Sequence, residues 1–403
     1  MMHSILTVIQ IVAAAGMVSS SLYYLMCLWS AAAFLRERKA GEGPFDCISG
    51  QVRPTRDLPP ISILKPLKGI DPEIYESFRS HCLQDYPDYE IVFGVSDAND
   101  PAIESVKALQ REFPGRRIQL MVGAKILGAN VKVSNLAQMM AEAHYDCLIV
   151  NDSDIRVETD YLRRVTAPLV DPHVGMVTCL YRGVAGGTLG SRLEALGIGT
   201  DFCASVLAAR QLEGGIRFGL GSTLAFRRGE LEKMGGFNSI VDRLADDYEL
   251  GKRIAALGLT VKLSDVVVET YLPPYPLRDF FGHQLRWARG VRDARAGGYF
   301  GLVFTFGILW ALLAVAASEG ARWSWSALVF TLLLRLAVAL VVGWSVLRDR
   351  QVLKYAWLIP LRDLIAAGVW MVSLGGHTVT WRGDRFTLED GKLTRISPKR
   401  SSG

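Results

Sequence analysis

The N-terminal segment constrains this chain most, because it contains about thirty consecutive uncharged residues, from Ile5 to Leu35. An α-helix needs only ~20 apolar residues to cross the hydrocarbon core of a bilayer. No basic segment precedes the run, whereas residues 36–39 are strongly basic, so the positive-inside rule places the next segment of the chain in the cytosol. The run is also too long for a cleaved signal peptide. We therefore predict an uncleaved transmembrane anchor over residues 1–35 and a linker over residues 36–58.

Further apolar stretches lie near the other end of the chain, within residues 298–375. Tyr299 to Ser318 and Ser326 to Leu347 are separated by a short polar connector and predict a helical hairpin. Arg335 interrupts the second stretch. A lone charge in hydrocarbon costs several kcal/mol, so we expect this side chain to face protein, a lipid headgroup or water.

The third stretch, Ala356 to Leu374, carries Arg362 and Asp363 side by side. Such a pair favours an interfacial or re-entrant helix as an alternative to a span. Three C-terminal spans would also leave the basic tail, residues 376–403, outside the cell, contrary to the charge rule.

Residues 59–275 show short β-branched runs that alternate with helical patterns, which is typical of an α/β fold with a mainly parallel sheet. The expected strands are Ile61–Leu64, Glu90–Ser96, Ile118–Val122, Cys147–Asn151, Val174–Leu180, Thr223–Phe226 and Val261–Ser264. The expected helices are Asp71–Cys82, Ala102–Phe113, Lys132–Ala143 and Asp246–Leu257. In such sheets ligands collect beyond the carboxyl ends of the strands.

Composition narrows the class of partner. A net charge of +5, from 45 basic and 40 acidic residues, gives no reason to expect a nucleic-acid partner. Half of the residues are apolar, which suits one soluble core plus membrane helices. The six cysteines show no CxxC pairing, so we expect small buried residues in a reducing compartment rather than a zinc site or disulfides.

Acidic residues follow two of the expected strands. Asp97 ends one strand, and Asp152 and Asp154 end another, two positions apart on an extended segment. Hard carboxylate oxygens suit Mg²⁺ or Mn²⁺ bound to a diphosphate, and a divalent cation stabilises a departing nucleoside diphosphate. A DxD pattern alone is a weak signal, but its place after a hydrophobic strand strengthens the prediction of a divalent-metal site.

A further acidic group opens the helix expected from Asp246. Asp246 could serve as the N-cap, with Glu249 completing a capping box. Asp247 would then lie in the first turn, free to act as a general base that deprotonates an acceptor hydroxyl.

Residues 276–297 combine aromatic and basic residues just before the apolar stretches. One side of a helix could carry the apolar residues and the other the arginines, as in a membrane-surface helix. A simple basic flank to the membrane segment is the alternative. The residues concerned are Leu277, Phe280, Phe281, Leu285 and Trp287, with Arg278, Arg286, Arg289, Arg292 and Arg295.

Asp97, Asp152 with Asp154, Asp247, and His283 to Trp287 together resemble the D, DxD, D, (Q/R)xxRW series of family 2 glycosyltransferases. Four segments resemble more closely the ceramide glucosyltransferase family, glycosyltransferase family 21: Ile63–Pro72, Asp85–Pro87, Asn99–Ala102 and Asp154–Val157. This similarity runs from about Pro59 to Arg295 and implies a cytosolic, Rossmann-like GT-A domain between membrane helices.

The resemblance also implies roles for individual residues. Asp97 would contact the uracil, Asp152 and Asp154 would hold the ribose and the metal-bound diphosphate, and Asp247 would be the catalytic base. Others would bind the nucleotide-sugar: Lys65, Pro66, Lys132, Arg286 and Trp287. The acceptor side would be formed by Gly219, Gly221, Ser222, Asp246 and His283.

Two positions depart from the family pattern. His283 stands where the general motif has Gln or Arg, and its imidazole can still donate a hydrogen bond. Phe202 stands where animal ceramide glucosyltransferases carry His, and the surrounding residues are similar to a bacterial branch that includes hopanoid-associated glycosyltransferases.

The resemblance therefore implies a multi-pass protein of the bacterial inner membrane with a cytoplasmic catalytic domain. We expect an inverting enzyme that transfers glucose or N-acetylglucosamine from a UDP-sugar to a membrane lipid such as ceramide. Transfer of N-acetylglucosamine to phosphatidylethanolamine is the main alternative. A processive polysaccharide synthase would need more membrane helices, and a non-catalytic scaffold would carry degenerate acidic motifs. No oligomeric state is predicted.

Overall fold

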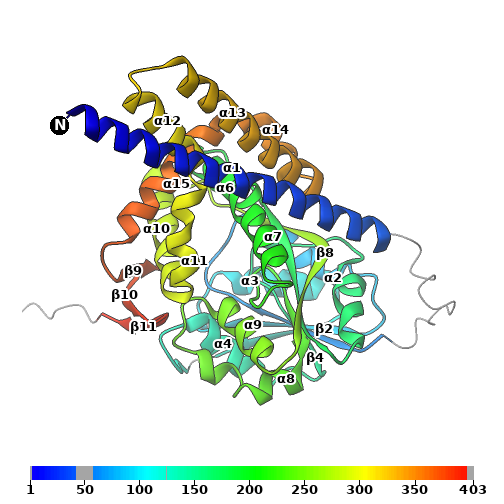
Figure 1. Ribbon diagram of the computed structural model, residues 1–403. Coiled ribbons are helices and arrows are strands. Elements are labelled where there is room, and N and C mark those ends of the chain that lie inside the picture. The colour runs from blue at the N-terminus through cyan, green and yellow to red at the C-terminus, as the bar shows by residue number, and fades with distance from the viewer. Residues whose placement is uncertain (1, 42–57, 124, 397–403) are drawn as a thin grey trace, which may run out of the picture. The chain divides into compact units, whose positions relative to one another are not determined.

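The computed structural model describes residues 2–41, 58–123 and 125–396 (Figure 1). The chain divides into two compact units. The sheet unit comprises residues 41–186, 214–273 and 378–403, and the helical unit comprises residues 1–40, 187–213 and 274–377.

The sheet unit is built on an eight-stranded sheet of order β3-β2-β1-β4-β7-β6-β8-β5. Its strands are β1 (Ile61–Pro66), β2 (Tyr89–Val95), β3 (Arg117–Val122), β4 (Cys147–Val150), β5 (Ile155–Arg156), β6 (Val174–Val184), β7 (Leu224–Arg227) and β8 (Thr260–Tyr271). The pairings β1–β2, β2–β3, β1–β4 and β6–β8 are parallel, and the others are antiparallel. Every residue of β1 and β2 is buried, as expected for strands covered on both faces. The prediction of a parallel-rich α/β fold is confirmed.

Helices cover this sheet and include all four that the sequence predicts. They are α2 (Ile74–Cys82), α3 (Ala102–Glu112), α4 (Val131–Met139), α5 (Tyr161–Thr166), α8 (Arg228–Lys233) and α9 (Asp246–Ala256). Two expected strands are longer than predicted, because β6 and β8 pair in parallel far beyond their apolar centres, to Val184 and Tyr271. The prediction also missed the two-residue strand β5, which pairs with the end of β8.

The basic tail carries a small antiparallel sheet that the sequence analysis did not predict. Its strands are β9 (Thr378–Trp381), β10 (Asp384–Glu389) and β11 (Lys392–Arg395). Two-residue turns join them, Arg382–Gly383 and Asp390–Gly391, and all four of these residues have positive φ. Paired positive φ angles match the twist of a hairpin, and Asp-Gly is a strong hairpin signal.

The helical unit contains the long helix α1 and helices from the middle and the C-terminal part of the chain. They are α1 (Met2–Gly41), α6 (Leu189–Gly197), α7 (Cys203–Leu212), α10 (Leu277–Ala294), α11 (Ala296–Gly301), α12 (Gly307–Ala317), α13 (Arg322–Ala339), α14 (Arg350–Tyr355) and α15 (Ile359–Ser373). A π-helix, residues 198–202, joins α6 to α7, and another, residues 340–346, extends α13.

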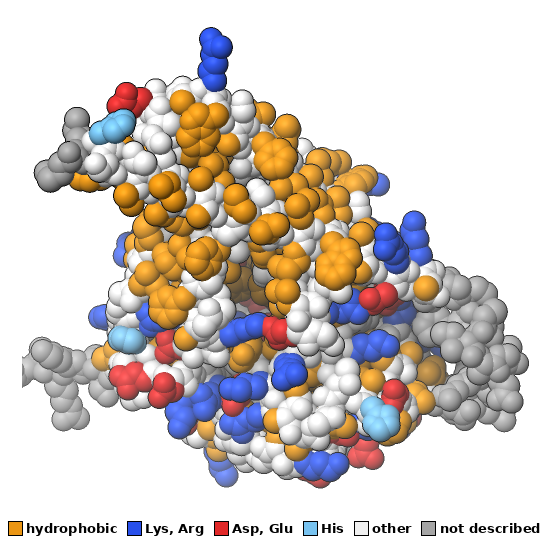
Figure 2. Space-filling view, viewed as in Figure 1, with side chains coloured by type: hydrophobic (Ala, Val, Ile, Leu, Met, Phe, Trp, Pro, Cys, Tyr) orange, Lys and Arg blue, Asp and Glu red, His pale blue; other side chains and the backbone are white. Residues whose placement is uncertain are grey.

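Within the described part of the chain, three helical segments are long and apolar enough to cross a membrane, namely His3–Ala40, Arg322–Val346 and Arg350–Ser373. Hydrophobic side chains gather on the surface of α1, α12 and α13 (Figure 2). The structure thus contains an N-terminal apolar helix and C-terminal apolar helices, as the sequence predicts. The third C-terminal segment begins earlier than expected, at Arg350.

The first C-terminal stretch is a bent pair of helices rather than one straight helix. Ala296–Thr305 and Gly307–Ala317 meet at 48°. The break frees backbone carbonyls, and hydroxyls of α1 satisfy two of them: Ser20 Oγ donates to Phe304 O at 2.8 Å, and Tyr24 Oη donates to Thr305 O at 3.0 Å. A broken helix is tolerated at membrane depth only where such partners exist.

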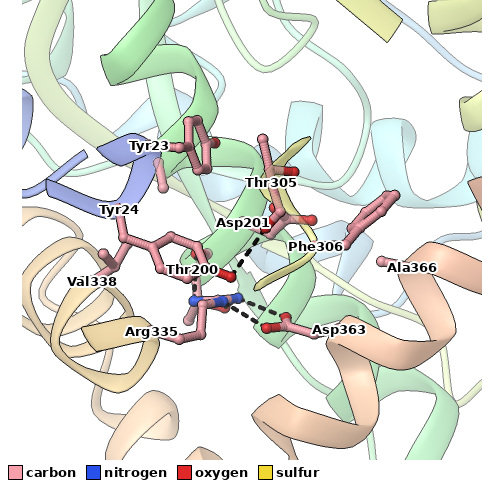
Figure 3. Close-up of a pocket in the computed structure, with 11 residues that line it drawn as sticks. Tyr23, Tyr24, Thr200, Asp201, Thr305, Phe306, Arg335, Val338, Asp363 and Ala366 are labelled. Atoms are coloured by element: carbon pink, nitrogen blue, oxygen red, sulfur yellow. Dashed lines mark hydrogen bonds and ion pairs between the residues drawn. The ribbon is translucent and has the colours of Figure 1, made fainter. Parts of the chain in front are cut away.

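Three charged residues inside the apolar segments, Arg335, Arg362 and Asp363, face protein. Arg335 makes two hydrogen bonds of 2.8 and 2.9 Å to Asp363 and one of 3.2 Å to the Thr200 carbonyl (Figure 3). Arg362 donates to Leu193 O and to Gln284 Oε1. The expectation for Arg335 is therefore confirmed. Adjacent charges occur on one helix because each has a partner elsewhere in the helical unit.

The cysteines of the described residues are all free and buried: Cys27, Cys82, Cys147, Cys179 and Cys203. This agrees with their prediction as small buried residues. Cys47 lies outside the described residues.

Candidate active site

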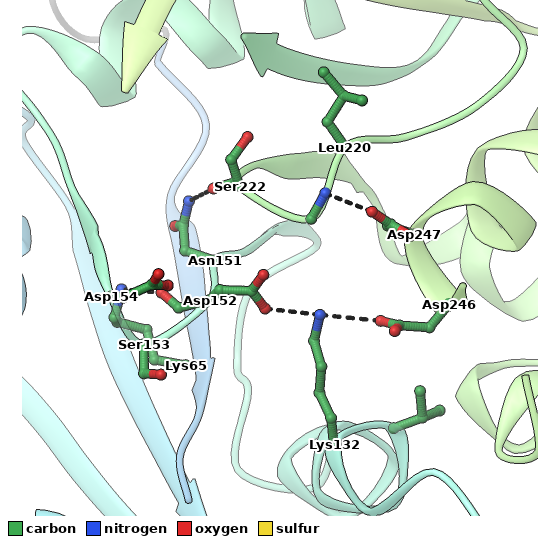
Figure 4. Close-up of polar contacts among 12 residues, drawn as sticks. Lys65, Lys132, Asn151, Asp152, Ser153, Asp154, Leu220, Ser222, Asp246 and Asp247 are labelled. Carbon is green, nitrogen blue, oxygen red and sulfur yellow. Dashed lines mark hydrogen bonds and ion pairs between the residues drawn. The ribbon is translucent and has the colours of Figure 1, made fainter. Parts of the chain in front are cut away.

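The loop after β4 carries the DxD residues, and hydrogen bonds from buried polar side chains fix its backbone (Figure 4). Asn151 donates from Nδ2 to Ser222 O at 2.7 Å and to Tyr161 Oη at 2.9 Å. Lys65 donates from Nζ to the Asp152 carbonyl at 3.0 Å. These contacts fix the backbone from which the two aspartates project.

Asp152 points away from the sheet toward Lys132, which lies in the first turn of α4 (Figure 4). Lys132 Nζ lies 2.7 Å from Asp152 Oδ1 and 3.1 Å from Asp246 Oδ2. Burial alone would lower the pKa of Lys132, but the charges of Asp152 and Asp246 raise it above its ordinary value. One ammonium thus joins the carboxylates of two segments that are distant in sequence.

Asp247 lies beside this ion pair, in the first turn of α9. Its Oδ2 accepts a hydrogen bond from Gly221 N at 2.7 Å, and its Oδ1 accepts from Tyr248 N at 2.8 Å. Burial and the neighbouring Asp246 raise the pKa of Asp247 to about 6. A carboxylate with a pKa near neutrality is suited to general-base catalysis.

The alternative role suggested for Asp246, a helix N-cap, is wrong. Ala245 occupies the N-cap position of α9 and no side chain caps the helix there. Glu249 binds Arg253 at 2.9 Å instead of completing a capping box. Asp246 is the first residue of α9. Its carboxylate does not cap the helix and instead contacts Lys132.

The glycines of residues 219–222 allow the close approach that the sequence analysis expected. A Cβ atom at Gly221 would lie 3.0 Å from Asp152 Oδ2 and 3.2 Å from Asp247 Oδ2. At Gly219 it would lie 2.9 Å from the Asp247 carbonyl. Ser222 is buried and donates to Cys179 O at 3.0 Å. Asp152 and Asp247 therefore face the same glycine, although 95 positions separate them in the chain.

Asp154 lies on the other side of the loop, beside Lys65 (Figure 4). The Thr270 hydroxyl donates to it. Burial and the charge of Asp152 raise the pKa of Asp154 to about 6. Burial lowers the pKa of Lys65 to about 7, against the opposing effects of Asp154 and Asp152. Asp152 and Asp154 carry the hard oxygen donors that divalent cations prefer.

The described residues do not themselves form a complete metal site. Among residues 2–41, 58–123 and 125–396, no group of three or more His, Cys, Asp or Glu side chains is arranged to hold a metal ion. Asp152 and Asp154 could supply two ligands, and the remaining ligands would then come from a diphosphate or water.

Two predicted donor-binding residues are buried, and a third lies in an exposed turn. Lys65 is fully buried and Pro66 is buried at the end of β1, so neither side chain lies on the surface of the sheet unit. Asp97 is exposed after β2 and accepts a hydrogen bond from Asn99 N at 2.9 Å. The structure places Asp97 beyond a strand end, as predicted, and shows no contact between it and the Lys132 cluster.

The remaining predicted residues lie in α10 of the helical unit and are described only within that unit. The rings of His283 and Trp287 lie 5.0 Å apart, and those of Trp287 and Phe202 lie 6.3 Å apart. His283 Nδ1 lies 2.7 Å from Oε1 of Glu194, whose carboxylate is buried. Arg286 is partly exposed on the same helix.

Several basic residues of the expected membrane-surface segment, residues 276–297, contact protein groups. Arg292 is buried and donates to Ser373 O, and Arg289 donates to Gly375 O at 2.9 Å. Arg295 binds Glu213. Carbonyls at the end of α15 thus accept hydrogen bonds from Arg292 and Arg289, because α10 packs against α15. A carboxylate engages Arg295, which follows the last residue of α10. Leu277 and Phe281 remain exposed.

Sequence analysis missed several residues that hold the site. Asn130 caps α4 by accepting from Val133 N at 3.2 Å, and its Nδ2 donates to Arg243 O at 2.8 Å. An Asn before a helical pattern is an N-cap signal that could have identified the first contact. Nothing local in the sequence marks Thr270 or Glu194, whose partners are distant in the chain.

Comparison with known proteins assigns the chain to a fold and to a family. The fold is that of the GT-A glycosyltransferases, and among solved structures the chain is similar to the mannosyltransferase PcManGT from Pyrobaculum calidifontis in complex with GDP-Man and Mn²⁺. The TM-score is 0.52 at 20% sequence identity, over 91% of this chain and 99% of that one. Residues 12–394 match glycosyl transferase family 21, and the chain belongs to that family.

Curated relatives agree with this assignment. The chain is 25% identical to ceramide glucosyltransferase 3 of Caenorhabditis elegans over 59% of its own length, but that match spans only 52% of the relative. It is 22% identical to ceramide glucosyltransferase 1 of the same organism, over 86% of this chain and 75% of the relative. A segment covering 28% of the chain is 37% identical to 24% of the ceramide glucosyltransferase of Komagataella phaffii.

Proposed function

We propose that this protein is an inverting glycosyltransferase that moves a hexose from a UDP-sugar to a lipid at the cytoplasmic face of a membrane. The observation that carries the proposal is the cluster in which Lys132 joins Asp152 to Asp246 beside Asp247. Family membership and the apolar helices support it, because a chain that combines a GT-A fold with apolar helices suits a lipid acceptor.

In the proposed reaction Asp247 is the general base. Its carboxylate takes the proton from the acceptor hydroxyl, the freed oxygen electrons form the new bond to the anomeric carbon, and the bond to the diphosphate breaks on the opposite face. The diphosphate leaves with the bonding electron pair, and the configuration of the sugar inverts. Gly221 supports the base, since its N–H holds Asp247 Oδ2 and its missing side chain leaves room for reactants.

The leaving group needs positive charge. We assign Asp152 and Asp154 to hold a Mg²⁺ or Mn²⁺ ion, which would supply charge stabilisation for the diphosphate. Lys132 orients Asp152 and supplies a further positive charge. Asp97 is assigned to the uracil. Lys65, being fully buried, is better explained as the support of the Asp152 backbone than as a direct ligand of the nucleotide.

Arg286 and Trp287 occupy the family's RW positions, and we assign them to the diphosphate and the acceptor, with His283 beside them. The relatives' names favour ceramide with glucose as donor sugar. Phe202 favours the bacterial branch, for which N-acetylglucosamine transfer to phosphatidylethanolamine in the inner membrane is the second candidate.

A direct test is to incubate the purified protein with labelled UDP-glucose or UDP-N-acetylglucosamine, Mg²⁺ or Mn²⁺, and vesicles that contain ceramide or phosphatidylethanolamine. One pair should give a labelled lipid whose sugar has the opposite anomeric configuration to the donor, as read by NMR. Asp247→Asn should lose at least ~100-fold of the rate, since it cannot accept the proton. Asp146→Asn, the same change at a side chain that is 95% exposed, is the control. Unchanged turnover in Asp247→Asn would refute the base assignment.

A further inference from the structure

The C-terminal sheet, strands β9 to β11, does not stand apart from the GT-A fold. The segment Asp242–Leu244 pairs with it as an additional edge: Leu393 N donates to Asp242 O at 2.7 Å, and Leu244 N donates to Gly391 O at 3.1 Å. Arg243 and Lys392 form the antiparallel bridge between these two bonds. The guanidinium of Arg243 also donates to Asp390 O at 2.5 Å.

Apolar packing closes the same contact. One side of the three-stranded sheet buries a small core with Leu244, and Ala129 and Trp381 pack against it. The buried members of this core are Leu244, Val379, Phe386, Leu388 and Leu393. Near the first turn of the sheet, the guanidinium of Arg382 donates to the Lys68 carbonyl, in the loop after β1.

The segment held in this way leads directly into the proposed catalytic cluster. Asn130 N donates to Val241 O at 2.7 Å, and Asn130 Nδ2 donates to Arg243 O at 2.8 Å. Asn130 caps the helix whose second residue is Lys132. Two residues after Leu244 the chain reaches Asp246, to which Lys132 is bound. A continuous set of contacts therefore joins the tail sheet to both partners of the ion pair.

We propose that residues 378–395 form a clasp, a positioning element that fixes the segment Val241–Leu244 and through it Lys132, Asp246 and Asp247. The role in catalysis rests on the proposed function, whereas the contacts do not. No residue of the clasp is among those assigned to the donor, the metal or the acceptor. Its residues act through Arg243 and Asn130.

The clasp also limits how many times the chain between the GT-A fold and the C-terminal sheet can cross the membrane. Because it belongs to the same unit as the GT-A fold, the two lie on one side of the bilayer, and the chain between residues 274 and 377 crosses an even number of times. Arg322–Val346 and Arg350–Ser373 supply two crossings. The bent pair, residues 296–317, then enters and leaves on one side. This arrangement removes the conflict between three spans and the basic tail.

The topological part can be tested without any assay of activity. In a Cys47→Ser background, Arg385→Cys on exposed β10 and Asp146→Cys on the GT-A fold are labelled with an impermeant maleimide. Both should react in inside-out vesicles and neither in intact spheroplasts. Labelling of the two cysteines from opposite sides would overturn the clasp, whatever the enzyme transfers.

The positioning part is tested on the full-length protein. Arg243→Ala should lower kcat ~10-fold, because displacements well below 1 Å at a reacting group are costly. The KM for the UDP-sugar should stay within ~2-fold, since the donor contacts are not removed. Arg243→Lys should restore most of the loss, because it keeps one donor to Asp390 O. Arg385→Ala, on an exposed side chain of the same sheet, is the matched control.

A purely structural role for the sheet predicts a different result. Arg243→Ala would then lower thermal stability and the amount of active protein while leaving kcat per folded molecule unchanged. That outcome would refute the positioning role. We also expect the amides of Asn130 and Leu244 to exchange hydrogen faster in Arg243→Ala, with no change at β2. This exchange can be measured even if no pair of donor and acceptor gives activity.

Discussion

Gly221→Ala is the smallest change that should disturb the proposed reaction. The added methyl group would lie 3.0 Å from Asp152 Oδ2 and 3.2 Å from Asp247 Oδ2, both shorter than the ~3.5 Å at which carbon contacts become favourable. Both carboxylates must therefore move by a few tenths of an ångström. The backbone of Gly221 does not have a positive φ, so alanine adds no conformational strain of its own.

The size of the effect follows from this geometry. A misplacement of 1 Å can cost ~100-fold in rate, so a shift of a few tenths should cost ~10-fold in kcat, or about 1.4 kcal/mol of activation free energy. The assay is initial-rate kinetics with a labelled UDP-sugar, together with thermal unfolding. Gly229→Ala, where a Cβ would meet no atom within 4 Å, is the control. Wild-type kcat in Gly221→Ala would show that Asp152 and Asp247 do not act together at this glycine.

Three more predictions concern other parts of the molecule. Asp247 must be ionised to accept a proton, and burial raises its pKa to about 6. Log kcat measured from pH 4.5 to 8 should therefore fall with unit slope below about pH 6. A flat profile below pH 6 would exclude Asp247 as the base. Arg335→Leu should destabilise the detergent-solubilised protein by ~3–5 kcal/mol, because it leaves Asp363 buried and unpaired. The Arg335→Leu/Asp363→Leu double variant should unfold close to the wild-type temperature, and equal losses of stability in both variants would contradict the pairing. Glu194→Gln should lower kcat when His283 is present and have little further effect in a His283→Gln background, as a double-mutant cycle would reveal.

The part of the fold that sequence predicted best is the part governed by local pattern. β4 is a continuous apolar run, and β1 and β2 are mostly apolar, so these strands could be predicted directly from the sequence. Asp97 and Asp152 follow β2 and β4, which located the edge of the sheet where ligands bind. The DxD loop and the start of α9 lie where strand ends and helix starts were expected. Their meeting at one glycine depends on the order of strands β4, β7 and β6 in the sheet, which the sequence pattern does not fix.

The features that sequence analysis missed depend on distant partners. The arginines of α10 have the spacing of a membrane-surface helix, but Arg292 and Arg289 donate hydrogen bonds to carbonyls at the end of α15. The clasp escaped prediction because its strands are short and its apolar residues are few, although Asp390–Gly391 is a hairpin signal. Phe386 and Leu388 do alternate with polar neighbours in β10, but this apolar pattern is short and lies among many basic residues.

The directions of the pKa shifts distinguish a site from a structural ion-pair network. In a network built for stability, each carboxylate would be balanced by a cation, its pKa would fall, and the pKa of each lysine would rise. Lys132 follows that pattern, and Lys65, Asp154 and Asp247 do not. Burial instead raises the pKa of Asp154 and Asp247 to about 6 and lowers that of Lys65 to about 7. At neutral pH these shifts lower the stability of the free protein, and buried groups with such shifts are common in catalytic and binding sites.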